Sequence, residues 1–246
     1  MYKKYYLNSQ LYNYKSDEYI KLLSRLEVKV FENILKTDLF EEAYGKDELL
    51  NWLCSKCNKF VGIDFSCEII RKAKLIKNKY NNLYYLLADV RRLPFKNDIF
   101  DLVISPSTLD HFSEIDLAIK EIYRVMKPNG LLIIVLHNKF NLPFILALDF
   151  QYALGLFLQK NFYYSFKDIV KILETNGFLI KYKTTIVHIP FLFSTISNCL
   201  ERLNSKCLRN INLFCINLIR KYSMYNTILH YLTGWFIAVI AQKYDK

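Results

Sequence analysis

Two kinds of residue in this sequence could do chemistry by their type and spacing: carboxylates that follow apolar runs, and a pair of cysteines. Asp64 and Asp89 each come at the end of a short apolar run, and carboxylates form strong charge-assisted hydrogen bonds with ligands. Cys54 and Cys57 form a C-x-x-C pair, but no second pair follows at zinc-finger spacing. We interpret the cysteines as half-buried packing residues, which leaves the two carboxylates as the candidate ligand site.

The apolar runs before these carboxylates predict strands of a parallel sheet. The expected strands are Lys59–Phe65, Leu83–Ala88, Phe100–Ser105 and Leu131–Leu136. Runs that are apolar on both faces suit a parallel sheet covered by helices on each side. Strands that alternate with helices imply right-handed crossovers, and ligands of such sheets bind at the carboxyl ends of the strands. Asp64 and Asp89 lie at those ends.

The rest of the chain is expected to be mainly helical, with a pair of strands closing the sheet. Helical periodicity extends from about Ser16 to Leu35, so that Thr37–Phe40 is the available first strand. Further helices are expected over Glu48–Ser55, Ile115–Met126, Asn141–Gln159, Ser165–Thr175 and residues 195–230. The closing strands are Phe178–Val187 and Gly234–Ala241.

Four fragments in this order resemble the motifs of class I S-adenosylmethionine-dependent methyltransferases, and most of all the small-molecule branch of the type 11 kind. The fragments are Val61–Ser66, Ala88–Phe95, Phe100–Ser105 and Glu121–Gly130. The resemblance implies an α/β fold: a Rossmann-like, seven-stranded, mostly parallel sheet with helices on both faces and a C-terminal antiparallel strand pair. It implies S-adenosylmethionine as the cofactor and methyl transfer as the reaction.

The resemblance also assigns residues to the cofactor site. They are Gly45, Asp64, Phe65, Asp89, Val90 and Ser105. Asp64 is expected to accept hydrogen bonds from the ribose hydroxyls, and Asp89 to accept one from the adenine amino group while the amide of Val90 meets the ring. The loop Leu109–Phe112 is similar to the active-site loop of the family.

Histidines near this loop are the candidates for acid–base chemistry, because an imidazole changes charge near neutral pH. His111 is the expected catalytic base for a hydroxyl acceptor, and the alternative is that it only orients its loop. His137, at the end of an expected strand, could also face the acceptor. His188 and His230 lie in apolar surroundings and are interpreted as core residues. We find no metal-binding constellation.

The glycine-rich loop of the family is degenerate in this chain. The family has an acidic residue followed by G-x-G-x-G, whereas the segment Leu39–Asp47 retains only Gly45, and Glu41 or Glu42 stands for the acid. Glycines in such a loop let the backbone approach the cofactor. Three interpretations therefore stay open: the loop is rebuilt and still binds, the chain is a binding or scaffold protein that has lost the cofactor, or a stretch of sequence has been lost here. We prefer the first, because Asp64, Asp89 and the loop Leu109–His111 persist.

Charge and composition bear on the partners. The net charge is +11, and residues 160–246 hold twelve Lys and Arg against four Asp and Glu. A basic half suits an acidic partner such as nucleic acid or an anionic membrane surface, but we prefer the interpretation as a plain basic surface. We expect a small-molecule or lipid-linked acceptor, with peripheral membrane contact left open. Nucleic acid is not expected, because Ser105–Thr108 lacks the N-P-P-Y type of motif. The sequence gives no oligomeric state.

We expect one methyltransferase-like domain over residues 1–246. Its parts are residues 1–58 (N-terminal helices with the degenerate strand and loop), 59–140 (cofactor-binding core), 141–165 (helical lid) and 166–246 (C-terminal strands and amphipathic helices). The first residues lack the apolar stretch of a secretory signal, which predicts a cytoplasmic location.

Overall fold

The computed structural model describes residues 8–26, 30–44, 48–76, 80–153, 161–202, 205–225 and 229–244. Seven strands form one sheet in the order β3-β2-β1-β4-β5-β7-β6. The strands are β1 (Phe31–Lys36), β2 (Cys57–Asp64), β3 (Leu83–Leu87), β4 (Phe100–Pro106), β5 (Met126–His137), β6 (Phe178–Ile186) and β7 (Phe236–Lys243). The first five pair in parallel, and β7 runs antiparallel to both β5 and β6. The expected fold class is confirmed.

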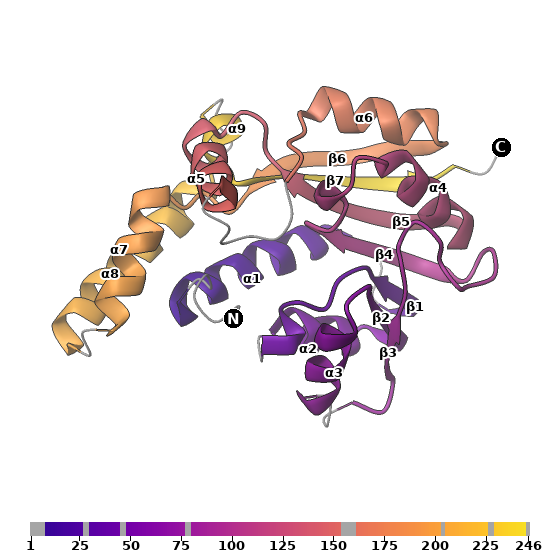
Figure 1. Cartoon of the computed structure of the whole chain (residues 1–246), viewed down its shortest axis with the longest axis horizontal. Helices are drawn as coiled ribbons and strands as arrows, with labels where there is room; N and C mark the ends of the chain where they lie inside the picture. Colours follow the sequence, from indigo (N-terminus) through magenta and orange to yellow (C-terminus); the bar gives the residue numbers. More distant parts are fainter. Residues whose placement is uncertain are drawn as a thin grey trace.

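Helices cover both faces of this sheet (Figure 1). They are α1 (Ser9–Leu23), α2 (Glu48–Cys54), α3 (Cys67–Ile76), α4 (Ile115–Val125), α5 (Leu142–Ala153), α6 (Phe166–Thr175), α7 (Phe191–Arg202), α8 (Lys206–Tyr222) and α9 (His230–Thr233), with short 3-10 turns η1 (Glu42–Tyr44) and η2 (Leu109–His111). Helices α1, α2 and α3 lie on one face, and α4 and α6 lie on the other.

Adjacent residues of a strand pack in two separate hydrophobic cores, because successive side chains of a strand point to opposite faces of the sheet. In β1, Ile34 packs with Leu53 of α2 in one cluster. Its neighbour Leu35 packs in the other cluster with Ile119 of α4 and Leu173 of α6. All five side chains are buried, and burial of an aliphatic side chain stabilises the fold by about 1.5–3 kcal/mol.

The expected helix Ser16–Leu35 is wrong in its second half, and the expected first strand Thr37–Phe40 is wrong as well. Helix α1 ends well before Leu35, β1 occupies the end of that segment, and Thr37–Phe40 is the loop after β1. Val30 and Ile34 fit a helical spacing, but short apolar runs do not distinguish a strand from a helix. Burial of both Ile34 and Leu35 on opposite sides decides for a strand.

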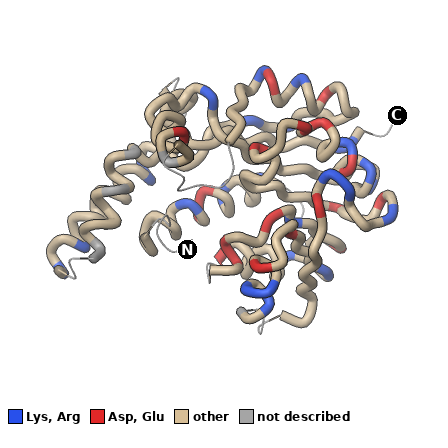
Figure 2. Tube along the Cα trace, in the orientation of Figure 1, with Lys and Arg blue, Asp and Glu red and all other residues tan. Residues whose placement is uncertain are grey.

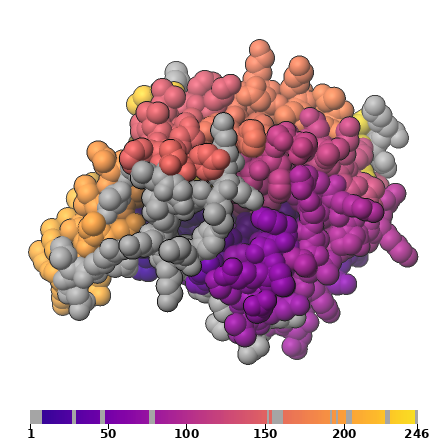
Figure 3. Space-filling view, in the orientation of Figure 1, coloured from indigo at the N-terminus to yellow at the C-terminus, as the bar shows by residue number. Residues whose placement is uncertain are grey.

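The expected helical region 195–230 is two helices. Helices α7 and α8 lie side by side and project from the body of the molecule (Figures 1 and 3); we call this pair the helical projection. It is fixed to α1, because Arg220 lies 2.7 Å from Asp17 and Asn212 donates to Gln10 at 2.8 Å. Of the helices described, none has the length and apolar character needed to cross a membrane.

Candidate functional site

The carboxyl ends of β1 and β4 meet at the point where the strand order of the sheet reverses, which is where such sheets bind ligands. Three buried hydroxyls close the seam between them. Thr37 Oγ1 donates to Ser105 Oγ at 3.0 Å and lies 2.9 Å from Thr108 Oγ1. Ser105, which was expected at the cofactor site, lies at this seam, where its hydroxyl accepts from Thr37.

Asp64 ends β2, directly beside this seam. Its Oδ1 accepts from the amide of Ser66 at 2.8 Å, and its Oδ2 accepts from the amide of Leu39 at 3.1 Å. The side chain is only 7% exposed, and this burial raises the pKa of the Asp64 carboxyl while the two amides oppose the rise. Each oxygen keeps a second lone pair, so Asp64 can still accept from two ligand hydroxyls. The ring of Phe65 is 59% exposed beside it.

Asp89 follows the neighbouring strand β3, and the amide of Ala88 donates to the carbonyl of Asp64 at 3.0 Å, so that the two carboxylates lie on adjoining strand ends. Arg91 clamps Asp89: its guanidinium donates to Oδ2 at 2.7 Å, and its amide donates to Oδ1 at 2.8 Å. These bonds hold the pKa of Asp89 below its usual range. Asp89 is therefore an anion that any further donor must share with Arg91. The side chain of Val90 is buried in the core.

The loop between β1 and α2 contains an ionic cluster where the family has glycines. Lys36, fully buried at the end of β1, donates to Glu42 Oε2 at 2.9 Å and to the carbonyl of Asp38 at 2.8 Å. Lys15 of α1 lies 2.6 Å from Glu41. We call these five residues the loop charge cluster. Burial raises the pKa of Glu42 to about 7, with Lys36 opposing the rise and the carboxylates of Asp38 and Glu41 adding to it.

Leu39 fixes this loop onto β2. A Cβ atom on Gly62 would lie 2.5 Å from Leu39 Cδ2, so the leucine fills the space above the glycine. Leu39 is fully buried. Because the amide of the same residue donates to Asp64, the packing of Leu39 on Gly62 sets the position of the carboxylate.

A second polar group lies at the ends of β4 and β5. Asp110 of η2 is fully buried, and its Oδ2 accepts from Ser107 Oγ at 2.9 Å and from the amide of His137 at 3.0 Å. Nδ1 of His137 contacts the same oxygen. Nε2 of His111, whose side chain is 33% exposed, lies 4.0 Å from Asp110 Oδ1. Burial raises the pKa of Asp110, but His137, His111 and Ser107 together outweigh the burial, so the net shift of this pKa is downward.

Aromatic rings surround His137. The ring centres of Phe236, Phe144 and Tyr163 lie 5.1, 5.6 and 6.1 Å from that of the imidazole. Phe144 also stacks on Trp235 at 4.4 Å. The end of β5 therefore presents apolar, flat side chains next to the polar group.

Helix α1 crosses this edge of the sheet and adds Tyr19. Its hydroxyl is buried without a hydrogen-bond partner, and burial together with the charges of Glu41, Asp38 and Asp110 raises its pKa. Those charges belong to the loop charge cluster and to the group at β4 and β5. Tyr19 therefore lies between the two halves of the candidate site.

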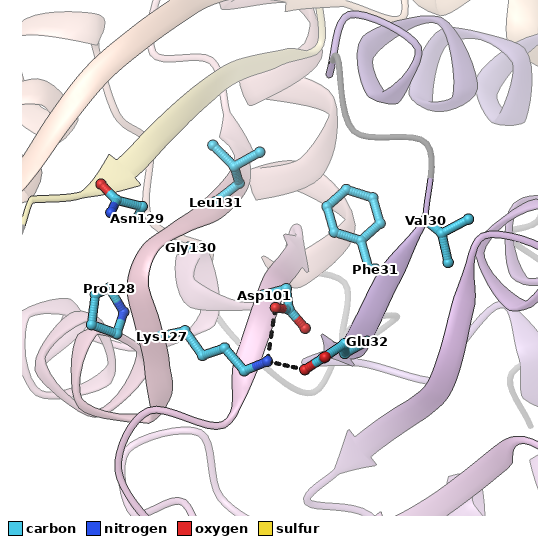
Figure 4. A pocket seen from close by; sticks show the side chains of 9 residues that line it. All are labelled: Val30, Phe31, Glu32, Asp101, Lys127, Pro128, Asn129, Gly130 and Leu131. Atoms are coloured by element: carbon cyan, nitrogen blue, oxygen red, sulfur yellow. Dashed lines mark hydrogen bonds and ion pairs between the residues drawn. The ribbon is translucent and has the colours of Figure 1, made fainter.

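The opposite edge of the sheet has a pocket of about 350 Å³ at the start of β1 and β4 (Figure 4). Lys127 crosses its wall, with Nζ 3.0 Å from Asp101 and in contact with Glu32. Asp101 also accepts from the amide of Asn33 at 2.7 Å. These groups satisfy one another and tie strands together, which supports a structural role for Asp101.

Comparison with known proteins shows that methyltransferases share this fold. A family model described as a methyltransferase domain matches residues 41–134. The N-methyltransferase NodS from Bradyrhizobium japonicum, solved with S-adenosyl-L-homocysteine, superposes with a TM-score of 0.59 over 97% of this chain and 91% of its own, at 11% identity. Residues 41–134 carry a methyltransferase domain.

Relatives of this methyltransferase domain match parts of the chain. The ubiquinone/menaquinone biosynthesis C-methyltransferase UbiE of Wigglesworthia glossinidia brevipalpis is 27% identical over 179 residues, which cover 65% of this chain and 71% of the relative. An uncharacterized protein of Methanocaldococcus jannaschii is 28% identical over 136 residues, or 53% of this chain. The chain spans about half the length of that archaeal relative, 51%.

The methyltransferase domain brings together only some of the residues expected at its cofactor site. Asp64, Asp89 and Ser105 lie at neighbouring strand ends, and Phe65 is exposed beside Asp64. Gly45 lies outside the described residues. Asp64 fits a ligand with paired hydroxyls, since each of its oxygens retains an acceptor site. Their roles toward the cofactor remain predictions.

Sequence analysis missed Lys36 and the partnership of Asp110 with His137. A lysine that follows two apolar residues and precedes an acidic run was the available signal for Lys36. His188 and His230 are buried and hydrogen-bonded, His188 to Thr233 Oγ1 at 3.0 Å, so their interpretation as core residues is confirmed.

Proposed function

We propose that this chain transfers a methyl group from S-adenosylmethionine to a small-molecule or lipid-linked acceptor. The observation that carries the proposal is the pair of carboxylates Asp64 and Asp89 on adjoining strand ends, within the stretch that matches the methyltransferase family. S-adenosylmethionine supplies a methyl group already activated on a positively charged sulfur. The protein therefore has to bind, orient and exclude water.

The chain's own residues supply these three actions. Asp64 holds the two ribose hydroxyls with its remaining lone pairs, and Asp89 shares its negative charge between Arg91 and the adenine amino group. Helix α1 covers the strand ends through Lys15 and Tyr19 and keeps water out. These roles need no further glycine in the loop between β1 and α2, because the loop charge cluster holds it.

The acceptor is apolar beside its reactive group. Phe144, Tyr163 and Phe236 around His137 favour such a molecule. The name of the UbiE relative, a C-methyltransferase of ubiquinone and menaquinone biosynthesis, supports the same class of acceptor.

Calorimetric titration with S-adenosylmethionine and with S-adenosylhomocysteine tests this function. The wild type and an exposed-site control, Asp116→Asn on α4, are expected to bind equally, whereas Asp64→Asn is expected to bind at least about tenfold more weakly, a loss of roughly 1.4 kcal/mol. Ligand at 100 times Kd stabilises the fold by about 2.7 kcal/mol, which a thermal shift detects independently.

No heat and no thermal shift from the wild type at millimolar ligand would overturn the proposal. The competing function, a methyltransferase-like binding or scaffold protein, then takes its place. The observation that favours it is the buried Lys36–Glu42 pair in the loop where the family has glycines.

We also propose that the helical projection rests on an anionic membrane surface. On α8, Ile211, Phe214 and Leu218 are exposed at a spacing that places them on one face. The same helix carries four cations and no acidic residue: Lys206, Arg209, Arg220 and Lys221. Figure 2 shows how few charges lie along the projection. Apolar contact plus basic flanks is the pattern of helices that lie in a membrane interface.

A further inference from the structure

We propose that His137, held by Asp110, is the base that takes a proton from a hydroxyl of the acceptor. The inference rests on the proposed function and deepens it, because it assigns both the base and the acceptor's reactive group. Sequence analysis gave this role to His111, and the geometry moves it to the histidine that contacts the buried carboxylate.

Three hydrogen bonds fix the position of Asp110. Its Oδ2 accepts from Ser107 Oγ and from the amide of His137 at 2.9 and 3.0 Å, and its own carbonyl accepts from the amide of Phe162 at 2.7 Å. Ser107 has a positive φ of 52°, a conformation that side chains other than glycine seldom adopt. Strain of this kind clusters at functional sites, and here it aims the serine hydroxyl at the carboxylate.

The contact with Asp110 decides how His137 can act. A carboxylate against Nδ1 favours the tautomer that carries the proton there, which leaves Nε2 as the proton acceptor and stabilises the ring once it is charged. His111 lacks this support, because its Nε2 lies 4.0 Å from Asp110 Oδ1, whereas Nδ1 of His137 is in contact with Asp110 Oδ2.

Unpaired polar atoms next to this pair indicate the missing ligand. Asp110 Oδ1, His111 Nδ1, His137 Nδ1 and Tyr19 Oη are buried without a hydrogen bond, although Nδ1 of His137 is in contact with Asp110 Oδ2. Buried polar groups of native proteins are nearly always hydrogen-bonded. A hydroxyl both donates and accepts, so it can serve these atoms as one group. The rings of Phe144, Phe236 and Tyr163 beside them fit the flat, apolar body that bears such a hydroxyl.

The proton step balances within the chain. The acceptor's oxygen gives its proton to Nε2 of His137 and keeps the bonding electron pair, so that oxygen, or a carbon conjugated to it, becomes the nucleophile. The positive charge that arises on the imidazole is offset by the negative charge of Asp110. The proton then leaves to solvent past the half-exposed His111.

The first test uses 4-nitrophenol, whose absorbance near neutrality distinguishes phenol from phenolate, and needs no cofactor. The wild type at pH 6 is expected to bind the probe with an increased phenolate fraction, and His137→Gln to lose that increase. The proposal is overturned if His137→Gln keeps the increase, if His111→Gln alone removes it, or if the wild type fails to bind the probe at millimolar concentration.

The second test is ¹⁵N NMR of the histidine rings, which does not depend on any ligand. The proton of the neutral His137 ring is expected on Nδ1 in the wild type; Asp110→Asn is expected to lower the fraction of this tautomer, while Asp116→Asn leaves it unchanged. An unchanged tautomer of His137 in Asp110→Asn overturns the pairing. Both tests are separate from calorimetry with S-adenosylmethionine, so failure of the base assignment and failure of the proposed function give different results.

Discussion

The positions of single side chains at the carboxyl edge of the sheet depend on the neighbouring residues that contact them. Leu39 is the example: its side chain packs on Gly62 while its amide donates to Asp64 at 3.1 Å. The position of the Asp64 carboxylate thus depends on a hydrophobic contact with Gly62, two residues earlier on the same strand. The same holds for His137, whose orientation depends on Asp110.

Gly62→Ala tests the contact with Leu39. The added methyl group meets a leucine that is fully buried and has little room to move, so the free energy of unfolding is expected to fall by about 1–3 kcal/mol, as for overpacking in other cores. Urea denaturation measures this change.

The double variant Gly62→Ala/Leu39→Ala provides the control. If the two side chains compete for one space, the double variant loses less stability than the sum of the single losses by more than about 0.5 kcal/mol. Strict additivity would contradict the contact.

At the scale of elements, the loop between β1 and α2 is rich in charged residues, and its ion pairs fix its position. Three carboxylates and two lysines meet in the loop charge cluster, which ties the end of β1 to α1 through Lys15 and Glu41. One carboxylate exceeds the number of cations. Glu42, which is fully buried, is the group whose pKa rises to about 7.

This raised pKa predicts how stability depends on pH. Glu42 binds its proton more tightly in the folded protein than in the unfolded chain, so its contribution is complete below about pH 4.5 and is lost as pH rises through about 7. The loss is of order 1–3 kcal/mol. Urea unfolding at pH 5 and at pH 8 measures it.

Glu42→Gln removes the titrating group and keeps its shape. The difference between the unfolding free energies at pH 5 and pH 8 is expected to shrink in this variant. An equally large difference in both proteins would show that another group is responsible.

The elements themselves were predictable to different degrees. The apolar runs of β2, β4 and β5 and the Ser165 cap of α6 were visible in the sequence, and the amide of Asp168 donates to that cap at 3.2 Å. Strand β1 was not, because Glu32, Asn33 and Lys36 interrupt its apolar run. Lys36 becomes compatible with burial through Glu42 and the carbonyl of Asp38, partners that no local pattern reveals.

The residues of the candidate site were also predictable to different degrees. Asp64 and Asp89 could be found because each follows a strand whose apolar run is evident. The pairing of Asp110 with His137 could not, since η2 and the end of β5 meet only when the sheet forms. Residues that act together across the sheet have no signal in their spacing.

The whole molecule combines a compact sheet domain with the helical projection, which is attached to α1 by Arg220 and Asn212. Exposed apolar side chains continue on α5, where Leu142, Leu146 and Phe150 are solvent-exposed. The basic excess of residues 160–246 lies partly on α8. A membrane on this side would meet both helices.

Vesicle flotation tests this contact. The wild type is expected to float with vesicles that contain phosphatidylglycerol and to float less with pure phosphatidylcholine, because each basic residue near an anionic surface adds about 1 kcal/mol. Phe214→Ser/Leu218→Ser is expected to lose most of the binding.

Leu179→Ser on β6 is the matched control, since this exposed leucine lies outside the projection. Equal flotation of all three proteins would contradict the proposed membrane contact. So would a wild type that does not float with anionic vesicles at low salt.

The position of β7 has a consequence for time as well as for shape. Strand β6 joins the sheet only through β7, and the chain passes through α7, α8 and α9 before β7 is reached. Closing so long a connection costs conformational entropy before the contacts between β6 and β7 stabilise the sheet. This entropy loss slows folding. We therefore expect β6 and β7 to acquire protection from hydrogen exchange last during refolding, after the parallel strands that hold Asp64 and Asp89 have already formed.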